Sequence, residues 1–221
     1  MLGLIYDVHG NLPALEAVLD DAPAEFFVLG GDYTLFGAWP VETIEMLESL
    51  DAEWIRGNGE RWSADPGAAP EDDAVQAAIE WVRGELGTQK VGELAALPTA
   101  FVSDEARYVH GSPVSDVRSF FPETAPDEVE LLEGVEEERL VFGHTHLPFI
   151  RRAGDIELVN PGSVGIPLDG DPRAAYALVG EDGSIEHRRV AYDHEASAAA
   201  VRERLGPAGE PFARRIETAT F

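Results

Sequence analysis

The chain has 221 residues, 44% of them hydrophobic and 9% aromatic, which is enough apolar material for one core and suits a single domain. Its 16 basic and 42 acidic residues give a formal net charge of −26, which argues against binding nucleic acid or an anionic membrane through a basic surface. Cysteine is absent, which excludes disulfide scaffolds, zinc fingers, iron–sulfur clusters and thiol nucleophiles. No apolar run approaches the roughly 18 residues of a membrane span, and no charged segment precedes the first apolar run. We expect a globular, cytoplasmic protein.

The basic residues are strongly skewed. Lys90 is the only lysine, and the other fifteen basic residues are arginines. A folded chain of this charge repels itself at low ionic strength, whereas at molar salt the Debye length falls to about 3 Å and screens the repulsion. The composition resembles that of halophilic proteins, although an acidic mesophilic protein is the alternative.

The first sixty residues alternate between strand-like and helix-like patterns. Apolar runs predict strands over 2–6, 25–29 and 53–56. Apolar residues spaced three or four apart predict a helix that begins after Asn11 and another over 41–50. This β-α-β-α-β order is typical of a parallel sheet covered by helices. Polar residues and glycines follow each strand, where open α/β sheets bind their ligands.

The rest of the chain is richer in strands. Residues 63–73 have the composition of a loop, and a helix with an apolar stripe from Val75 to Leu86 follows, so that 63–97 form a candidate cap over the site. Strands are predicted at 100–103, 107–110, 139–142, 149–152, 156–160, 174–179 and 185–192, with a turn at 104–106. A helix is predicted at 194–205, and 206–221 are assigned as a tail without a pattern. We therefore predict an α/β fold, a four-layer α/β/β/α sandwich of two mixed sheets flanked by helices, in one domain of residues 1–221.

Four histidines lie in short polar motifs that follow strand-like segments. In chain order the motifs are Asp7-Val8-His9, Gly31-Asp32, Gly57-Asn58, His110-Gly111 and Gly143-His144-Thr145-His146. They supply oxygen and nitrogen donors without thiolate, a set that suits Mn²⁺, Fe, Zn²⁺, Co²⁺ or Ni²⁺. If the strand period of two persists, both side chains of an Asp-x-His or His-x-His motif point to the same side. Seven donors are too many for one tetrahedral ion and suit two ions that share a carboxylate.

The ordered set resembles the calcineurin-like metallophosphoesterases, whose motifs are D-x-H, G-D, G-N-H-[DE], a lone H and G-H-x-H. The resemblance spans residues 4–167, about three quarters of the chain. Residues 7–11 and 160–165 further resemble the small phosphodiesterase-like branch. The G-D-x-V-D-R-G motif of the Ser/Thr protein phosphatase branch is absent after Asp32.

The resemblance implies two divalent metal ions, with Mn²⁺ favoured, and a role for each motif residue. The implied ligands are Asp7, His9 and His146 for the first ion, Asp32 as a bridge, and Asn58, His110 and His144 for the second ion. A metal-bridging hydroxide held by Asp32 would attack a small phosphoester, a phosphodiester in preference to a monoester. The alternative is a non-catalytic metal-binding scaffold or protein-interaction module on the same fold. The sequence leaves open whether the chain forms a homo-oligomer.

One motif departs from the family pattern. The usual G-N-H is Gly57-Asn58-Gly59 here, so the histidine that the resemblance credits with protonating the leaving oxygen is missing. General acid catalysis is worth about 10²–10⁴-fold, and a phenolate or a phosphate of an anhydride needs it less than an alkoxide does. We expect slower turnover rather than an inert site, with Glu60 or a metal-bound water as candidate replacement acids.

Overall fold

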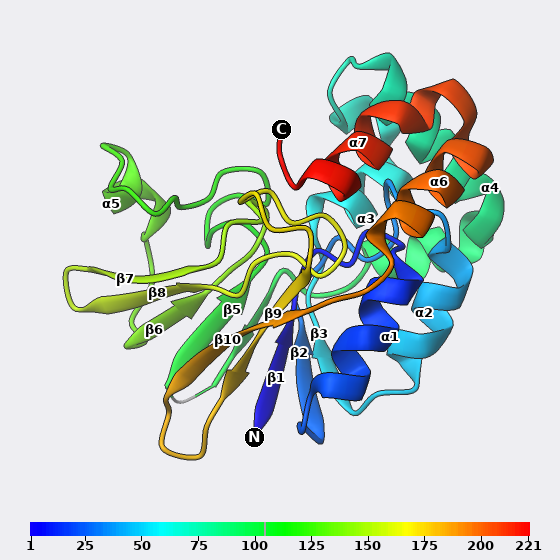
Figure 1. Ribbon diagram of the computed structural model, residues 1–221. Coiled ribbons are helices and arrows are strands. Elements are labelled where there is room, and N and C mark those ends of the chain that lie inside the picture. Colours follow the sequence, from blue (N-terminus) through cyan, green and yellow to red (C-terminus); the bar gives the residue numbers. More distant parts are fainter. Residues whose placement is uncertain (104) are drawn as a thin grey trace.

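The computed structural model describes residues 1–103 and 105–221, so the turn expected at 104–106 lies partly outside the described residues. Two five-stranded sheets form its centre (Figure 1). The first has the order β10-β9-β1-β2-β3 and consists of β1 (Leu2–Ile5), β2 (Phe26–Leu29), β3 (Ala52–Trp54), β9 (Ala174–Val179) and β10 (Ile185–Val190). The second has the order β4-β5-β6-β8-β7 and consists of β4 (Ala100–Val102), β5 (Ala106–Val109), β6 (Arg139–Val141), β7 (Phe149–Ala153) and β8 (Ile156–Asn160).

Both sheets are mixed, as predicted. Strands β1, β2 and β3 run parallel, and β9 and β10 complete that sheet in antiparallel pairings. In the second sheet β5, β6 and β8 run parallel, with β4 and β7 antiparallel at the edges. The carboxyl ends of the parallel strands within each sheet therefore lie at one edge, which places the loops after β1, β2 and β3 together and those after β5 and β6 together.

Apolar layers hold the sheets and helices together. Helices α1 (Leu12–Asp21) and α2 (Pro40–Glu48) cover the outer face of the first sheet (Figure 1), where Leu15 and Ile44 pack with strand residues such as Leu29. The inner faces of the two sheets meet through a cluster that includes Leu4 and Val141. The outer face of the second sheet is covered by a loop and the four-residue helix α5 (Glu128–Leu131). The predicted order of layers is confirmed, and its fourth layer is thin.

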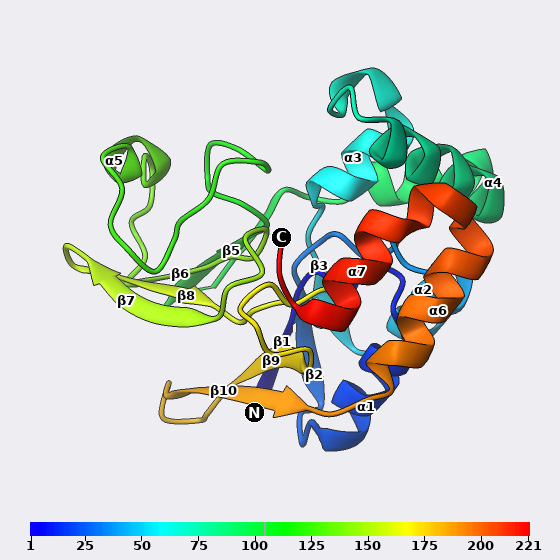
Figure 2. The same cartoon turned by 45° about the horizontal axis from the view of Figure 1, so that its top comes forward.

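A separate group of helices lies beside the ends of the strands (Figure 2). It contains α3 (Asn58–Ala64), the 3₁₀ turn η1 (Pro66–Ala68), α4 (Asp73–Ala95), α6 (His194–Leu205), the 3₁₀ turn η2 (Gly206–Gly209) and α7 (Glu210–Thr218). Helix α4 bends at Gly87, whose φ of 74° suits glycine, and it continues beyond the predicted stripe. In the described part of the chain, no helix has the length and apolar character needed to cross a bilayer.

The assignment of residues 206–221 as a tail is wrong. They form η2 and α7, and α7 buries Phe212, Ala213 and Ile216 against α4 and α6. Helices α3 and α5 were also missed. Segments of four to nine residues present too few turns for a periodic pattern, and such short helices depend on tertiary packing rather than on intrinsic propensity.

We predict that Phe212→Ala destabilises the protein by about 3–5 kcal/mol, the usual range for loss of a buried aromatic ring. Phe212 is 2% exposed and stacks on Phe36 at 4.2 Å between ring centroids. Urea denaturation measures the loss, and Phe221→Ala is the matched control because Phe221 is 82% exposed. Equal stabilities of the two variants would contradict the assigned packing of α7.

Candidate metal centre

The seven predicted ligands all follow carboxyl ends of parallel strands. They are Asp7 and His9 after β1, Asp32 after β2, Asn58 after β3 as the first residue of α3, His110 after β5, and His144 and His146 after β6. All are buried except His144, which is half-buried. The structure brings them into two adjoining groups, because Asp7 Oδ1 of the first lies 4.0 Å from the His110 ring of the second.

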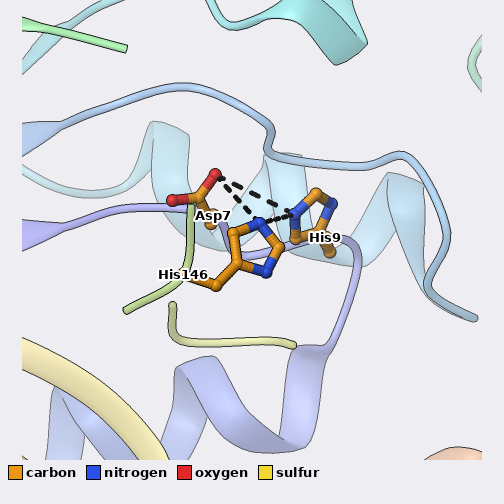
Figure 3. A group of neighbouring side chains, drawn as sticks. All are labelled: Asp7, His9 and His146. Atoms are coloured by element: carbon orange, nitrogen blue, oxygen red, sulfur yellow. Dashed lines mark hydrogen bonds and ion pairs between the residues drawn. The ribbon is translucent and has the colours of Figure 1, made fainter. Parts of the chain in front are cut away.

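The first group consists of Asp7, His9 and His146 (Figure 3). The Nε2 atoms of His9 and His146 lie 3.1 Å apart. Asp7 Oδ1 lies 3.9 Å from His9 Nε2 and 3.5 Å from His146 Nε2. His9 Nδ1 lies 2.9 Å from the backbone carbonyl oxygen of Leu35, and His146 Nδ1 lies 2.5 Å from that of Ile166. A carbonyl only accepts, so each Nδ1 carries the proton and each Nε2 presents a lone pair.

With both rings in this neutral tautomer, the converging atoms of the first group are all acceptors. Asp7 Oδ1 is buried and has no hydrogen-bond partner in the described part of the chain. Buried acceptors that face one another without a donor are unfavourable unless a cation lies among them. The donor set of two imidazoles and one carboxylate therefore fits a divalent metal ion.

The second group consists of Asp32, His110 and His144, with Asn58 beside them. His110 donates from Nδ1 to the Gly30 carbonyl at 2.8 Å, and its Nε2 lies 3.5 Å from Asp32 Oδ1. Burial opposes the charged ring, but the charges of Asp32 and Asp7 outweigh it and raise the pKa of His110. One polar atom of the Asn58 amide lies 3.0 Å from His110 Nε2 and 2.8 Å from His144 Nδ1. When that atom is the amide oxygen, it can accept from a protonated ring or, beside neutral rings that present lone pairs, serve as a ligand to a cation. When it is the nitrogen, it donates to both rings.

The backbone at these ligands corrects the explanation based on strand period. Strands β1 and β6 end at Ile5 and Val141, before the motifs begin. Positive φ angles occur instead at Asp7 (53°), His9 (52°), Asp32 (54°), His144 (67°) and His146 (59°). Left-handed backbone at a residue other than glycine costs on the order of 1–3 kcal/mol and concentrates at functional sites. The paired side chains converge because the loops are tightly turned, not because the strands continue.

Close backbone approach explains a glycine of the last motif. A Cβ atom at Gly143 would lie 2.4 Å from Asp7 Oδ2, so only glycine fits there. The next residue, His144, donates its backbone N–H to the same Asp7 oxygen at 3.0 Å. The first and second groups are thus joined through Asp7.

Burial dominates the electrostatics of the site. It lowers the pKa of His9 to about 3 and that of His144 to about 4, with nearby histidines adding to the effect, so both rings are neutral at physiological pH. Burial and the charge of Asp7 together raise the pKa of Asp32. Burial opposes ionisation of Asp7 also, but His146 and the other imidazoles outweigh it and lower its pKa. Two buried carboxylates this close are short of positive charge, which divalent ions would supply.

Glu60 holds two of the ligand loops together. Its carboxylate accepts the backbone N–H groups of Asp32 at 2.9 Å, Tyr33 at 2.8 Å and Gly57 at 2.8 Å. Burial and the charge of Asp32 raise its pKa to about 7. Glu60 is only 2% exposed and both of its oxygens accept from the backbone, so the structure argues against it as the replacement general acid.

We predict that Glu60→Gln destabilises the protein by about 1–3 kcal/mol, because the new amide nitrogen faces N–H donors that lose their acceptor. Urea denaturation measures this loss, and elemental analysis of the dialysed protein should show less bound metal. Glu16→Gln on the exposed face of α1 removes the same charge outside the site and should change neither quantity. A Glu60 variant as stable as the Glu16 variant would contradict the positioning role.

Sequence reasoning missed Asp116, which lies beside the second group. Its carboxylate pairs with Arg61 through two hydrogen bonds of 2.6 and 2.7 Å, and its carbonyl lies 3.1 Å from the Asn58 amide. The loop that carries Asp116 has neither a periodic pattern nor a motif, so no signal in the sequence pointed to it. Phe36 links His9, at 5.6 Å between ring centroids, to Phe212 of α7.

Comparisons with known proteins agree with this geometry. The sequence profile of the calcineurin-like phosphoesterase superfamily domain matches residues 1–183. The uncharacterized protein MJ0912 of Methanocaldococcus jannaschii is 30% identical, with 93% of each chain covered. Phosphodiesterase YfcE of Escherichia coli is 29% identical over 80% of this chain and 85% of its own. The crystal structure of a metallophosphoesterase from Sphaerobacter thermophilus superposes with a TM-score of 0.86 at 27% identity, covering 99% of this chain and 98% of the other. The chain therefore belongs to the calcineurin-like phosphoesterase superfamily.

Proposed function

We propose that this protein is a phosphoesterase that uses two divalent metal ions, Mn²⁺ in preference to Fe, Zn²⁺, Ni²⁺ or Co²⁺. One observation carries the proposal: two adjoining groups of buried carboxylate and imidazole side chains converge, and Asp7 Oδ1 in the first group has no hydrogen-bond partner among the described residues. Asp7, His9 and His146 would hold the first ion, and Asn58, His110 and His144 the second. Asp32 would be shared. When bound, the ions lower the pKa of water and neutralise charge on the phosphoryl oxygens.

The residues of the chain prepare the site for this chemistry. The backbone carbonyls of Leu35, Ile166 and Gly30 fix three imidazoles with Nε2 directed inward. Glu60 fixes the loops that carry Asp32 and Asn58, so little reorganisation is needed when substrate arrives. With glycine at position 59 and Glu60 engaged by the backbone, we propose that no side chain protonates the leaving group. Substrates with good leaving groups should therefore be hydrolysed fastest.

We further propose that the substrate is a small phosphodiester rather than a phosphomonoester. The relative YfcE is named a phosphodiesterase, and the charge of −26 disfavours a long polyanion. We propose that residues 1–221 act as one domain, with 63–97 as a cap over the site, in the cytoplasm of a cell with high internal salt. Salt would screen the repulsion between the acidic surface and an anionic substrate.

We predict metal-dependent hydrolysis of bis(4-nitrophenyl) phosphate, measured as release of 4-nitrophenolate in molar KCl with Mn²⁺. The rate should fall to background with EDTA and return when Mn²⁺ is added in excess, because the ions generate the nucleophile. Elemental analysis should find two ions per chain. Protein that holds metal but hydrolyses neither this diester nor 4-nitrophenyl phosphate would favour the alternative, a non-catalytic scaffold.

A further inference from the structure

A cavity of about 520 Å³ opens beside the second group of ligands, and His110 forms part of its wall. Three arginines, Arg56, Arg61 and Arg107, line it together with a single acidic residue, Asp116. The whole chain has only 16 basic residues against 42 acidic ones, so three guanidinium groups around one cavity stand out against the general charge. Such a concentration favours an anionic ligand at this place.

Two of the three guanidinium groups are already neutralised. Arg61 pairs with Asp116, and Arg107 pairs with Glu137 through hydrogen bonds of 3.0 and 3.1 Å. Three arginines against these two carboxylates leave one positive charge, which is that of Arg56.

Arg56 has no carboxylate partner within 4.0 Å in the described part of the chain. Its one side-chain hydrogen bond there is long, 3.3 Å from Nη1 to the Ala95 carbonyl. Its Nε is buried and donates to nothing among the described residues. A buried guanidinium N–H without an acceptor is costly, and the cost is removed when a ligand oxygen accepts it.

The fold brings Arg56 to the same cavity as the metal ligands. Arg56 lies two residues after the end of β3 and two residues before Asn58, while His110 follows β5 of the other sheet. Arg56 and His110 both act on the carboxylate of Asp116. Burial opposes ionisation of Asp116, but the neighbouring positive groups outweigh burial and lower its pKa, Arg61 most strongly and His110 and Arg56 to a smaller extent. A molecule that reaches from the second group of ligands into the cavity would pass these side chains.

We propose that Arg56 binds a second phosphate group of the substrate, separate from the phosphorus that is hydrolysed. The natural substrate is then a phosphodiester that carries an additional phosphate, and Arg56 selects it over the diester without one. This inference rests on the proposed function for the identity of the reaction, but the binding preference is a property of the cavity and can be measured without turnover.

Two chromogenic esters test the proposal, because they differ only in the second phosphate. They are thymidine 5′-(4-nitrophenyl phosphate) and the same ester phosphorylated at the 3′ oxygen, and both release 4-nitrophenolate. We expect kcat/KM of the wild-type protein to be about tenfold or more higher for the bisphosphate ester, the size of one charge-assisted hydrogen bond. Arg56→Ala should reduce this ratio to about one, and Arg56→Lys should retain part of it.

Arg214→Ala is the matched control, since Arg214 is exposed on α7, away from the residues that line the cavity, and carries the same charge. This variant should leave the ratio of kcat/KM between the two esters unchanged. All measurements use one KCl concentration, because salt weakens both esters' binding to a different extent.

Calorimetric titration with thymidine 5′-phosphate and thymidine 3′,5′-bisphosphate separates this inference from the proposed function. Tighter binding of the bisphosphate by wild type, lost in Arg56→Ala, supports the second-phosphate site even when neither ester is hydrolysed. If both esters are hydrolysed with equal kcat/KM and the two nucleotides bind with equal affinity, the second-phosphate site is refuted, whereas the proposed phosphoesterase activity is supported. A preference that survives in Arg56→Ala also overturns the role of Arg56.

Discussion

Asp32→Asn is expected to lower kcat for bis(4-nitrophenyl) phosphate by about 10³-fold or more, equivalent to roughly 4 kcal/mol of transition-state stabilisation. Asp32 Oδ1 lies 3.5 Å from His110 Nε2, and Asp32 is the one carboxylate of the second group. An uncharged amide cannot offset the charge of two divalent ions in its place. Steady-state kinetics with saturating Mn²⁺ and elemental analysis measure the loss of rate and of metal.

The same variant should be no less stable than wild type when metal is removed. Burial and the charge of Asp7 raise the pKa of Asp32, so the ionised side chain is unfavourable in the metal-free fold, and neutralising it relieves the repulsion. Urea denaturation in EDTA tests this point. Asp51→Asn, an exposed carboxylate in the turn before β3, is the control and should alter neither activity nor stability. A large loss of stability in Asp32→Asn, or near-normal activity, would contradict the role of Asp32.

Gly59→His is expected to raise the rate for diesters with alkoxide leaving groups by about 10²–10⁴-fold, and to change the rate for nitrophenyl esters much less. Position 59 lies in the first turn of α3, and its backbone N–H donates to Asp32 Oδ1 at 2.6 Å. An imidazole there would stand next to Asp32, where under the proposed function a leaving oxygen would receive its proton. The comparison of methyl 4-nitrophenyl phosphate with dimethyl phosphate, each over a range of pH, measures the effect.

Gly59→Ala is the control that separates the imidazole from its Cβ atom. A Cβ at this position would lie 3.0 Å from Asp32 Oδ1 and 3.4 Å from Leu35 Cβ, so the carboxylate must shift by a few tenths of an ångström in both variants. If Gly59→His and Gly59→Ala behave alike with alkyl diesters, the added ring does not act as an acid. A higher rate with alkyl diesters that appears only in Gly59→His, with a new pH dependence, supports the proposal that the wild-type site lacks a general acid.

Most of the strands and the candidate ligands were predictable because their signals are local. An apolar run such as 27–29 is buried in the sheet, and the order of strands and helices restricts the topology to a few arrangements. The ligand motifs carry their chemistry in the residue types themselves. The roles of Glu60 and Asp116 were not predictable in this way, because each depends on a partner from another segment, such as Arg61 for Asp116.

The amino-acid sequence by itself determined the two mixed sheets, the helices of the first sixty residues and the identity of the seven donor side chains. Only the tertiary structure decided that Asp7 and His146, 139 positions apart, lie 3.5 Å from one another, and that α7 packs on α4 and α6. It also decided that Arg56 and His110 line one cavity, where Arg56 has no carboxylate partner in the described part of the chain. The physical reason is the range of the forces involved. Periodic burial acts between neighbours in the chain, whereas charge, hydrogen bonding and close packing act between whatever groups the finished fold brings into contact.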